Sequence, residues 1–382
     1  MRQIKSVNVF TQGDSTKPST WSNVPYSFSN ALEKCGIKVN RIDIIPENNL
    51  LFRKYAILWD KVIKKIISRI FKDQTYSIDR SYPFRILVNK KIKNAVRFYN
   101  DADYNIFLTY SYKNKFSSIP SLLMCDYTFE YFIEEKLRRI PNLIEKSYIN
   151  YEKKIITESE IVICLFSTVA AYMTSKYSNK INYLGRIGLN IVSQEQLIES
   201  HVITKKETSD YILFIGSWNQ SYNDAAKLLI DTFILLKGSY PDLKLYIIGM
   251  GENAFSKIPS GVTCFGYLDK ENEDQRKIYY DLLLNAKMFI NTSGSYCATV
   301  EAMYYYTPVI TSKYEEFIHE FGNELSFGLY CDKENKNLLL LKIKEILESS
   351  EYTSMCISAH ETVVPNTWQE FSKRIIHIMS EN

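Results

Sequence analysis

The residues best suited to chemistry lie in the stretch AKMFINTSGSYCATVEAMYYYTPVITS, positions 286–312. A loop of small polar residues at 292–296 leads into a predicted helix start, whose backbone N–H groups belong to Cys297, Ala298 and Thr299. Such N–H groups lack partners within the helix and form an anion site, typically for phosphate. One turn further along, Glu301 would repel a phosphate but can accept hydrogen bonds from a ribose diol. These residues favour a nucleotide site, and an ordinary strand–helix unit with a surface glutamate is the simpler alternative.

Two strands must hold this helix start in place. Residues 287–291 form a short apolar run that predicts a buried strand. We expect the helix over 298–306, its end at Pro308, and a second strand over 309–311. In such a unit the helix start faces the carboxyl ends of the strands, so the anion site is expected at that edge of the sheet.

The run FINTSGSYCATVEAMYYYTPVI resembles the donor-site signature of family 4 glycosyltransferases and their retaining relatives. That signature is E-x7-E, continuing as EAMA-x-G-T/K-PVI, and residues 301–303 and 307–310 match it. The first glutamate of the pair would fall at 293, where this chain has Ser293. Because that glutamate usually holds the donor sugar's hydroxyls, the resemblance makes Ser293 a candidate at the reacting sugar. It implies donor nucleotide contacts for Glu301 and the helix start.

Composition indicates two folded domains. A chain of 382 residues with 46% apolar and 14% aromatic residues can fill two cores. Seven scattered cysteines without metal-ligand spacing favour a reducing, cytoplasmic compartment. The first residues lack the apolar region of a signal peptide, and no run of 18 apolar residues predicts a membrane span.

A basic segment, 51–97, stands out from the rest of the chain. Between positions 53 and 97 there are 13 Lys or Arg and 3 Asp. Residues 51–72 have the spacing of an amphipathic helix. Such a helix could lie on an anionic membrane at the inner face of the cell membrane, or pack its apolar face inside the domain. The two possibilities are compatible if the helix packs its apolar face inside the domain and presents only its cations to lipid. No nucleic-acid motif accompanies the charge, so no nucleic-acid partner is expected.

The first domain is expected to begin with a strand at 4–10, a helix at 22–35 and a strand at 39–45, an order typical of a doubly wound α/β domain. The segment from Trp21 to Tyr26 resembles W-S-G-x-P-Y of some family 4 members, with Asn23 in place of glycine. Asparagine also tolerates positive φ. The resemblance implies acceptor-side contacts for Gly13, Trp21 and Asn23, and an ordinary strand–helix loop is the alternative.

Asp126 is the candidate catalytic residue of the first domain. Strands are expected over 104–110 and 119–125, and the following Cys-Asp-Tyr-Thr-Phe resembles Thr-Asp-Ala-Thr-Phe of one family branch. The resemblance places Asp126 at a strand end facing the cleft, where it would touch the sugar or the acceptor. The alternative is that Asp126 or Thr128 only caps a helix.

The second domain resembles the family across 211–251, where a strand, a helix at 223–236 and a strand at 243–248 are expected. The family's Arg and Lys that grip the diphosphate are missing, since Ser217 replaces the Arg. Lys227 is a candidate substitute. The resemblance implies donor contacts from two loops, formed by Gly216, Ser217 and Asn219 and by Gly266, Tyr267 and Leu268. The second loop would read the base through its main chain.

The expected fold is α/β, of the GT-B type: two doubly wound Rossmann-like domains facing across a cleft. Residues 181–191 would close the first sheet and 194–210 would form a linker. Helices are expected over 142–157, 313–322 and 335–363. The domains are 1–205, on the acceptor side, and 206–365, which binds the nucleotide sugar. Residues 366–382 form a helix that crosses back to the first domain.

The resemblance implies transfer of a hexosyl group from a nucleotide-diphosphate sugar to a hydroxyl of a glycan or lipid-linked glycan. Family membership implies retention, a role in cell-surface polysaccharide or lipopolysaccharide synthesis, and no metal or other cofactor, because helix starts hold the diphosphate. Two alternatives remain: a non-catalytic GT-B subunit that binds glycan or a partner transferase, and a nucleotide-sugar hydrolase or epimerase.

Overall fold

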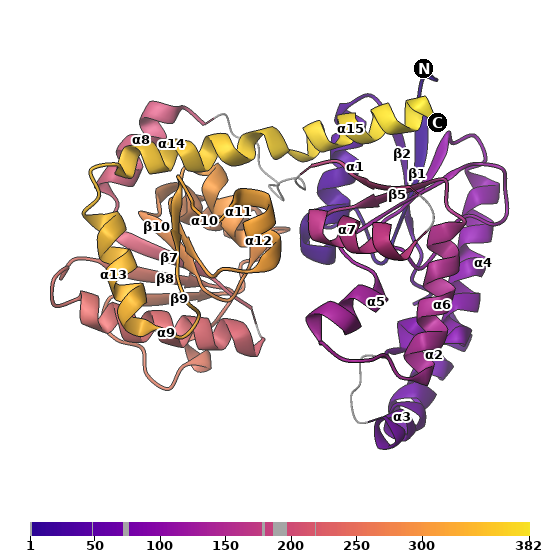
Figure 1. Ribbon diagram of the computed structural model, residues 1–382, viewed down its shortest axis with the longest axis horizontal. Helices are drawn as coiled ribbons and strands as arrows, with labels where there is room; N and C mark the ends of the chain where they lie inside the picture. The colour runs from indigo at the N-terminus through magenta and orange to yellow at the C-terminus, as the bar shows by residue number, and fades with distance from the viewer. Residues whose placement is uncertain (1, 48, 72–75, 178–179, 186–196, 218) are drawn as a thin grey trace. The chain divides into compact units, whose positions relative to one another are not determined.

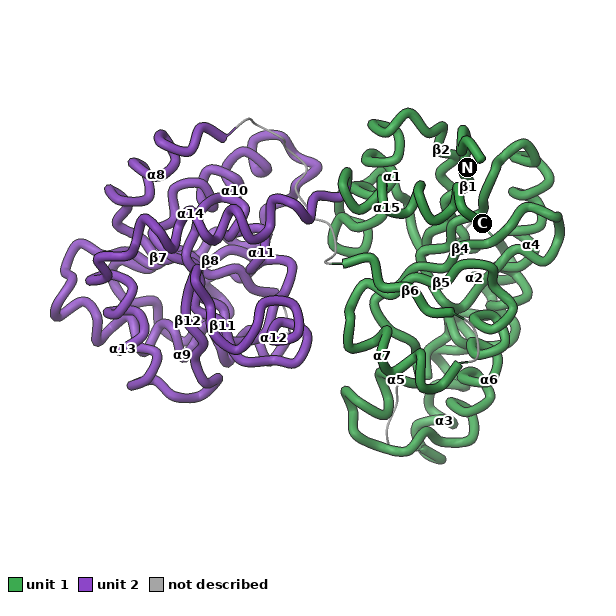
Figure 2. The backbone as a smooth tube through the Cα atoms, turned by 45° about the horizontal axis from the view of Figure 1, so that its top comes forward, with its two compact units in different colours: residues 1–187, 369–382 green, residues 188–368 purple. Residues whose placement is uncertain are grey.

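The computed structural model describes residues 2–47, 49–71, 76–177, 180–185, 197–217 and 219–382. The chain divides into two compact units, residues 1–187 with 369–382 and residues 188–368 (Figure 2). The sequence predicted the boundary between the two domains at 205/206, whereas the two units of the structure divide at 187/188. The expected family resemblance of 186–191 and the first part of the expected linker lie outside the described residues.

Unit 1 is built on a six-stranded parallel sheet in the order β2-β1-β3-β4-β5-β6. β1 pairs with β2 on one side and β3 on the other, so the sheet grows in both directions from its first strand. Every residue of β1, β3 and β5 is buried, as expected for strands covered on both faces. The strands are β1 (Ser6–Thr11), β2 (Lys38–Asp43), β3 (Tyr104–Phe107), β4 (Ser121–Cys125), β5 (Ile161–Cys164) and β6 (Ile181–Tyr183).

Helices flank this sheet (Figure 1). Local signals set their starts: Pro25 lies in the first turn of α1, and Asn142 with Glu145 forms a capping box at α6. They are α1 (Val24–Lys34), α2 (Leu50–Leu58), α3 (Lys64–Ile70), α4 (Tyr82–Phe98), α5 (Phe129–Tyr131), α6 (Leu143–Thr157), α7 (Ser167–Lys176) and α15 (Trp368–Glu381), whose residues from 369 onward belong to unit 1.

Unit 2 has its own six-stranded parallel sheet, in the order β12-β11-β10-β7-β8-β9. β7 pairs with β8 on one side and β10 on the other, so strand order reverses between β7 and β10. In open α/β sheets, ligands bind beyond the carboxyl ends of the strands at this reversal. The strands are β7 (Tyr211–Ile215), β8 (Lys244–Ile248), β9 (Val262–Gly266), β10 (Met288–Asn291), β11 (Val309–Thr311) and β12 (Gly328–Tyr330).

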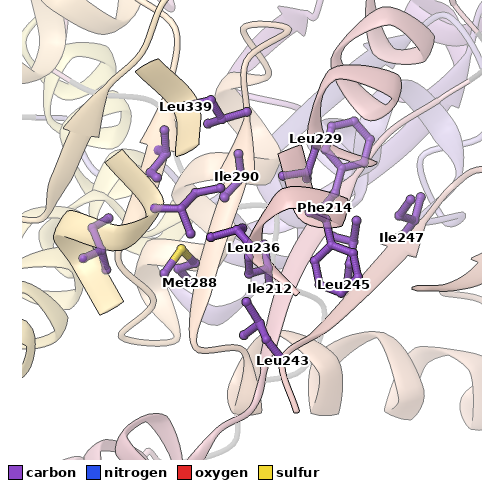
Figure 3. Packing of buried hydrophobic residues seen from close by; sticks show 14 of the residues in the cluster. Ile212, Phe214, Leu229, Leu236, Leu243, Leu245, Ile247, Met288, Ile290 and Leu339 are labelled. Atoms are coloured by element: carbon purple, nitrogen blue, oxygen red, sulfur yellow. The ribbon is translucent and has the colours of Figure 1, made fainter. Parts of the chain in front are cut away.

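The core of unit 2 lies between this sheet and its helices. Ile212, Phe214, Met288 and Ile290 pack with helix residues such as Leu229 (Figure 3). The helices are α8 (Glu199–Thr208), α9 (Gln220–Leu236), α10 (Glu273–Asn285), α11 (Tyr296–Tyr304), α12 (Glu315–Phe321), α13 (Lys336–Leu347) and α14 (Tyr352–Val363).

Three helix predictions need correction. The expected linker contains α8, which is anchored because Val202 enters the core and buried Lys206 Nζ donates to the Leu283 carbonyl at 2.7 Å. The helix expected over 298–306 begins at Tyr296 and ends at Tyr304. The helical stretch expected over 335–363 forms two helices, α13 and α14, with a break at 348–351.

The predicted amphipathic helix 51–72 is formed as α2, a π-helical turn (Trp59–Ile63) and α3, with Lys72 outside the described residues. Packing into the domain accounts for only part of its apolar face. Trp59 is buried and Phe52 packs on the core of unit 1. Most other apolar side chains are exposed, with fractions between 43% and 72%: Leu50, Leu51, Ile57, Leu58, Val62, Ile66 and Ile70. α3 lies at the lower end of unit 1 in Figure 1.

Candidate active site

The loop after β10 is held by the side chain of Asn291. Its Nδ2 donates to the Ile215 carbonyl at 2.8 Å, which joins the loop to the end of β7. Its Oδ1 accepts from the Ser293 N–H at 2.9 Å and from the Ser293 hydroxyl at 2.5 Å. Ser293 is therefore oriented at the strand reversal, and its hydroxyl oxygen keeps lone pairs that can accept a hydrogen bond.

The start of α11 follows this loop. The helical hydrogen bonds begin with the Thr299 N–H, which donates to the Ser295 carbonyl at 3.2 Å. Thr299 was expected to offer its N–H to an anion, and that expectation is wrong because the helix begins two residues earlier than predicted. The first turn consists of Tyr296, Cys297 and Ala298, so Cys297 and Ala298 keep the positions expected of them.

Glu301 is 4% exposed and forms a cluster with two residues that the sequence reasoning did not connect to it. Its Oε2 accepts from Lys270 Nζ at 3.1 Å and from the Tyr279 hydroxyl at 2.6 Å. Burial, followed by the charge of Glu301, raises the pKa of Tyr279 well above its usual value, so the phenol is a fixed donor. Both contacts fall on Oε2, which leaves Oε1 without a partner among the described residues.

Lys270 comes from the loop between β9 and α10. Its ammonium lies 4.0 Å from the centre of the Tyr279 ring and pairs with Glu301, so it is held on two sides. The cluster therefore fixes the Glu301 carboxyl group next to the start of α11 through one oxygen, while its other oxygen can still accept a hydrogen bond. Its role toward a ribose diol stays a prediction.

Gly216 ends β7 at the strand reversal. A Cβ there would lie 2.7 Å from Phe214 Cε1 and 2.9 Å from Met250 Sδ, so a larger residue would require these side chains to move. At the facing Gly249, with φ of +86°, a Cβ would lie 2.1 Å from the Gly216 carbonyl oxygen. This close approach of two backbones brings the loops after β7 and β8 together.

A pocket of about 210 Å³ opens beside these glycines. Ser217 lines it together with Asn223 and Lys227 of α9 and with residues 249–251, 253 and 254 after β8. Lys227, the proposed substitute for the missing cations, thus shares a pocket with Ser217. Asn219 is instead the N-cap of α9, because its Oδ1 accepts from the Tyr222 N–H at 3.3 Å, and α9 begins earlier than the expected residue 223.

The predicted base-reading loop follows β9. Gly266 has φ of +67°, donates to the Met250 carbonyl at 3.2 Å and accepts from the Gly249 N–H at 2.7 Å. The main chain of Gly266 is thus committed to the loop after β8. Tyr267 is 64% exposed whereas Leu268 is buried, so Tyr267 presents an open aromatic face next to the glycine. A ligand at this loop could therefore contact the ring of Tyr267 as well as the backbone of Tyr267.

Unit 1 holds a second group of predicted residues. Asp126 and Trp21 line one pocket of about 330 Å³, with Thr11, Gln12, Pro25, Leu108, Thr109 and Cys125. The pocket lies at the carboxyl ends of β1, β3 and β4, where strand order reverses in this unit. Burial raises the pKa of Asp126, whose Oδ1 accepts from the Tyr127 N–H at 3.0 Å. Thr128 caps α5 by accepting from the Tyr131 N–H, so the capping role belongs to Thr128.

Three consecutive residues of the loop before α1 have positive φ: Trp21 (40°), Ser22 (51°) and Asn23 (73°). For residues other than glycine this conformation is strained, and such strain gathers at binding sites. The turn places Trp21 on the pocket and buries Asn23 at the start of α1. Gly13 has φ of +111°, and its N–H donates to Asp43 Oδ1 at 3.0 Å, which fixes the beginning of this loop.

Glu152 is a candidate that the sequence reasoning missed. It is 4% exposed in α6, and its Oε2 accepts from the Phe129 N–H at 2.8 Å. Burial raises the pKa of Glu152 to about 7, against the lowering effects of the Phe129 N–H and of Arg80. Glu152, Arg80 and Asp126 line a pocket of about 210 Å³ with Tyr127 and nine other residues. The sequence signal that could have identified Glu152 is its position, as a glutamate, on the apolar face of the predicted helix 142–157.

The site residues therefore form two groups, one in each unit. Unit 2 brings the loop at 292–295, the start of α11 and Glu301 to one edge of its sheet, and unit 1 brings Trp21 and Asp126 to one pocket. In the part of the chain that the structure describes, no three His, Cys, Asp or Glu side chains gather in a way that could hold a metal ion. The same residues include no helix long and apolar enough to span a membrane.

Residues 209–349 match the family model described as glycosyl transferases group 1. No curated protein matches the chain.

Among solved structures, sucrose-phosphate synthase from Thermosynechococcus elongatus is similar, with a TM-score of 0.64 at 13% identity, over 99% of this chain and 98% of that chain. WaaG, a glycosyltransferase involved in lipopolysaccharide biosynthesis, gives 0.63 at 12% identity, over 98% and 100%. Anabaena Alr3699/HepE in complex with UDP-glucose gives 0.60 at 12%, over 99% and 100%. At these identities the likeness shows the fold, which is GT-B.

Proposed function

Because residues 209–349 match the family model described as glycosyl transferases group 1, and because the fold is GT-B, we propose that the protein transfers a sugar from a nucleotide-diphosphate donor to a hydroxyl of a glycan or lipid-linked glycan. The donor's nucleotide would occupy the strand reversal of unit 2. The observation that carries the proposal is the buried Glu301 carboxylate beside the start of α11, with Oε2 held by Lys270 and Tyr279.

In this proposal each group has one task. The first turn of α11 stabilises the diphosphate, which becomes the leaving group, through backbone N–H groups and the helix dipole. Glu301 Oε1 accepts from the ribose diol. Ser293 accepts from a hydroxyl of the donor sugar while it donates to Asn291. Positioning and stabilisation of the leaving group supply the rate enhancement, so no metal or other cofactor is required.

We place the acceptor in the unit 1 pocket that Trp21 and Asp126 share. An indole face and a carboxylate are suited to the apolar side and the hydroxyls of a sugar ring. Retention of anomeric configuration, a hexosyl donor and a role in cell-surface polysaccharide or lipopolysaccharide synthesis are parts of the same proposal. They are supported by the resemblance of residues 286–312 and by the function printed for WaaG.

The test compares Glu301→Gln with Tyr279→Phe by calorimetric titration of UDP, GDP and ADP. Glutamine keeps the size of Glu301 but loses its charge, so the affinity of the nucleotide that binds the wild type should fall at least about tenfold. Tyr279→Phe removes a contact to Oε2 of the same carboxyl group and leaves Oε1 in place, so a smaller loss is expected. Equal affinity of the wild type and Glu301→Gln would remove Glu301 from the donor site.

The non-catalytic alternative makes a different prediction. A subunit that only binds glycan or a partner transferase would not turn over any nucleotide sugar. The replacement of the family's first glutamate by Ser293 is the feature that favours it. Release of nucleoside diphosphate from a nucleotide sugar, lost on Asp126→Asn, would exclude this alternative.

We also propose that the protein works at the inner face of the cell membrane as a peripheral protein, with α2 and α3 on the lipid. The exposed side of these helices carries Leu50, Leu51, Ile57, Leu58, Val62, Ile66 and Ile70. Exposed cations lie among them: Arg53, Lys54, Lys61, Lys64, Lys65 and Arg69. An apolar surface bordered by cations matches the boundary between acyl chains and anionic headgroups.

Vesicle flotation at low salt tests this placement. Neutralising Lys61, Lys64, Lys65 and Arg69 together should weaken binding to anionic vesicles, at about 1 kcal/mol per charge near the surface. Replacing Ile66 and Ile70 by serine should weaken binding to anionic vesicles without changing its salt dependence. If the wild-type protein does not bind anionic vesicles, the exposed side of α2 and α3 is only a solvated surface.

A further inference from the structure

Two pockets lie next to each other at the strand ends of unit 1, and the proposed function uses only one of them. The Trp21 pocket, where we place the acceptor, has a volume of about 330 Å³. The Glu152 pocket has about 210 Å³. The residues that line both pockets form their common border: Gln12, Thr109, Cys125 and Asp126. A ligand in the Trp21 pocket that extends past Asp126 therefore enters the Glu152 pocket.

A stacked aromatic pair forms part of the wall of the Glu152 pocket. The rings of Tyr127 and Phe132 have their centres 5.8 Å apart, with 13° between their planes. Tyr127 is 38% exposed and Phe132 is half-buried, so a ligand in the pocket can reach the pair. Sugar rings pack on aromatic rings through the face that carries their C–H groups. The pair is thus suited to hold a sugar ring by stacking.

Groups that bind hydroxyls line the same pocket. Glu152 and Asp126 contribute carboxyl groups, and Gln12, which is exposed, contributes an amide. The Arg80 guanidinium lies 4.3 Å from the centre of the Phe129 ring, which holds it in place at the pocket. Carboxyl and amide oxygens accept from hydroxyl groups, and the guanidinium donates to hydroxyl oxygens. The pocket therefore combines a stacking surface with donors and acceptors for the rim of a sugar ring.

Charge and size favour a neutral sugar over an anion. Three carboxyl groups line the pocket, those of Asp79, Asp126 and Glu152, and Arg80 is its one basic residue. Asp79 Oδ2 lies 3.6 Å from Arg80 Nη1 and offsets its charge, so the pocket has no surplus of positive charge for a phosphate. Its 210 Å³ correspond to the liquid volume of about seven water molecules, which is room for one sugar ring.

We propose that the Glu152 pocket is a second acceptor subsite, so that the acceptor is a glycan of at least two sugars. The sugar that receives the transferred group lies in the Trp21 pocket beside Asp126, and the adjoining sugar stacks on Tyr127 in the Glu152 pocket. This inference rests on the proposed function and deepens it by naming the acceptor class, a di- or oligosaccharide rather than a single sugar.

The test measures transfer by the full-length protein from the nucleotide-diphosphate sugar that binds it to two sets of acceptors. One set contains the octyl glycosides of glucose, galactose, mannose and N-acetylglucosamine. The other contains octyl disaccharides that end in the same four sugars. For the terminal sugar that is used best, kcat/KM should be at least about tenfold higher for the disaccharide, because its second ring adds stacking and hydrogen bonds.

Tyr127→Ala removes the more exposed ring of the aromatic pair. This change should lower the ratio of kcat/KM for disaccharide to kcat/KM for monosaccharide about tenfold. Tyr127→Leu keeps apolar bulk against Phe132 and should lower the same ratio, which separates the loss of stacking from a defect in folding. Phe98→Ala is the matched control, because Phe98 is 78% exposed, packs 4.7 Å from the Tyr99 ring and lines neither pocket. It should leave the ratio unchanged.

Equal kcat/KM for monosaccharides and disaccharides in the wild type would overturn the second subsite, and so would an unchanged ratio in both Tyr127 variants. An equal loss for the two acceptor sets in these variants would also overturn it, because Tyr127 would then act on the Trp21 pocket or on the fold. If the wild type transfers sugar to neither set, the proposed function itself fails, and this outcome is distinct from the others.

Discussion

The proton held by Glu152 gives a prediction whose size follows from the structure. Its carboxyl is buried in α6 beside the pocket that contains Asp126, and its pKa rises from 4.5 to about 7 because burial disfavours the charged form. The perturbation is Glu152→Gln, which keeps a carbonyl oxygen to accept from the Phe129 N–H.

The sign follows from where each state binds the proton. Between pH 4.5 and 7 the folded protein keeps a proton on Glu152 that the unfolded chain releases, so stability falls as pH rises through this window. The favourable contribution is complete below the unfolded pKa and lost above the folded one. A shift of this size corresponds to about 3 kcal/mol across the window, at 1.36 kcal/mol per unit.

The assay is urea unfolding of unit 1 at a series of pH values from 4.5 to 8. Wild type should lose about 3 kcal/mol more than Glu152→Gln over this range. Glu134→Gln is the control in the same unit: burial raises the pKa of Glu134, but hydrogen bonds from Lys176 and Tyr172 lower it overall. That variant should not flatten the profile. Parallel profiles for wild type and Glu152→Gln would refute the reasoning.

Three further outcomes are expected. Ser22→Gly should raise the free energy of unfolding by about 1 kcal/mol, since Ser22 has φ of 51° in a region that glycine enters without strain, and a decrease would contradict this. Ser293→Ala should slow sugar transfer by a factor that corresponds to about 1–3 kcal/mol while nucleoside diphosphate affinity stays unchanged, and wild-type rates would remove Ser293 from the sugar site. Lys270→Met should destabilise unit 2 by about 3 kcal/mol because it leaves Glu301 buried without its cation, and an unchanged melting temperature would show that the pair is solvated.

The elements around the donor site were predictable from the sequence because their signals are local. The apolar run before Asn291 and the restart after Pro308 gave both strands of the αβ unit, β10 and β11. Within this αβ unit only the bounds of α11 were wrong, and the neighbouring helix α9 also begins before the expected residue 223. Its last residues, Tyr305 and Tyr306, leave the helix, with Tyr306 at φ of 58°, and no residue type at these positions indicates this.

Groups held by distant partners could not be predicted. Lys270 and Glu301 are 31 positions apart, and only the folding of the loop after β9 brings them together. The segment 194–210 was expected to be a linker because it is polar and lacks a strong period, but the ammonium of its Lys206 is buried and donates to the Leu283 carbonyl and the Thr307 hydroxyl. A lysine at a core position cannot be recognised from hydrophobic periodicity, because that pattern counts every lysine as a surface residue.

The amphipathic helix shows a third kind of limit. Periodicity predicted the helix and its two faces, but periodicity is the same whether the apolar face is buried or open. The structure buries Trp59 and exposes Leu51, Ile66 and Ile70 along the same helix. The exposure of the apolar face, which neither charge nor spacing could settle, is what favours a membrane surface.

Donor binding is the central claim, and a thermal-shift screen of the wild-type protein against UDP-, GDP-, ADP- and CMP-sugars tests it most directly. One nucleotide-diphosphate sugar should stabilise unit 2, by about 2.7 kcal/mol at a concentration of 100 times its Kd, and CMP-sugars, with a single phosphate, should not. At the same ligand concentration Glu301→Gln should lose about half of this stabilisation or more, since a tenfold weaker Kd leaves about 1.4 kcal/mol. If no nucleotide-diphosphate sugar stabilises the protein, or if the shift is undiminished in Glu301→Gln, the donor site is not at Glu301.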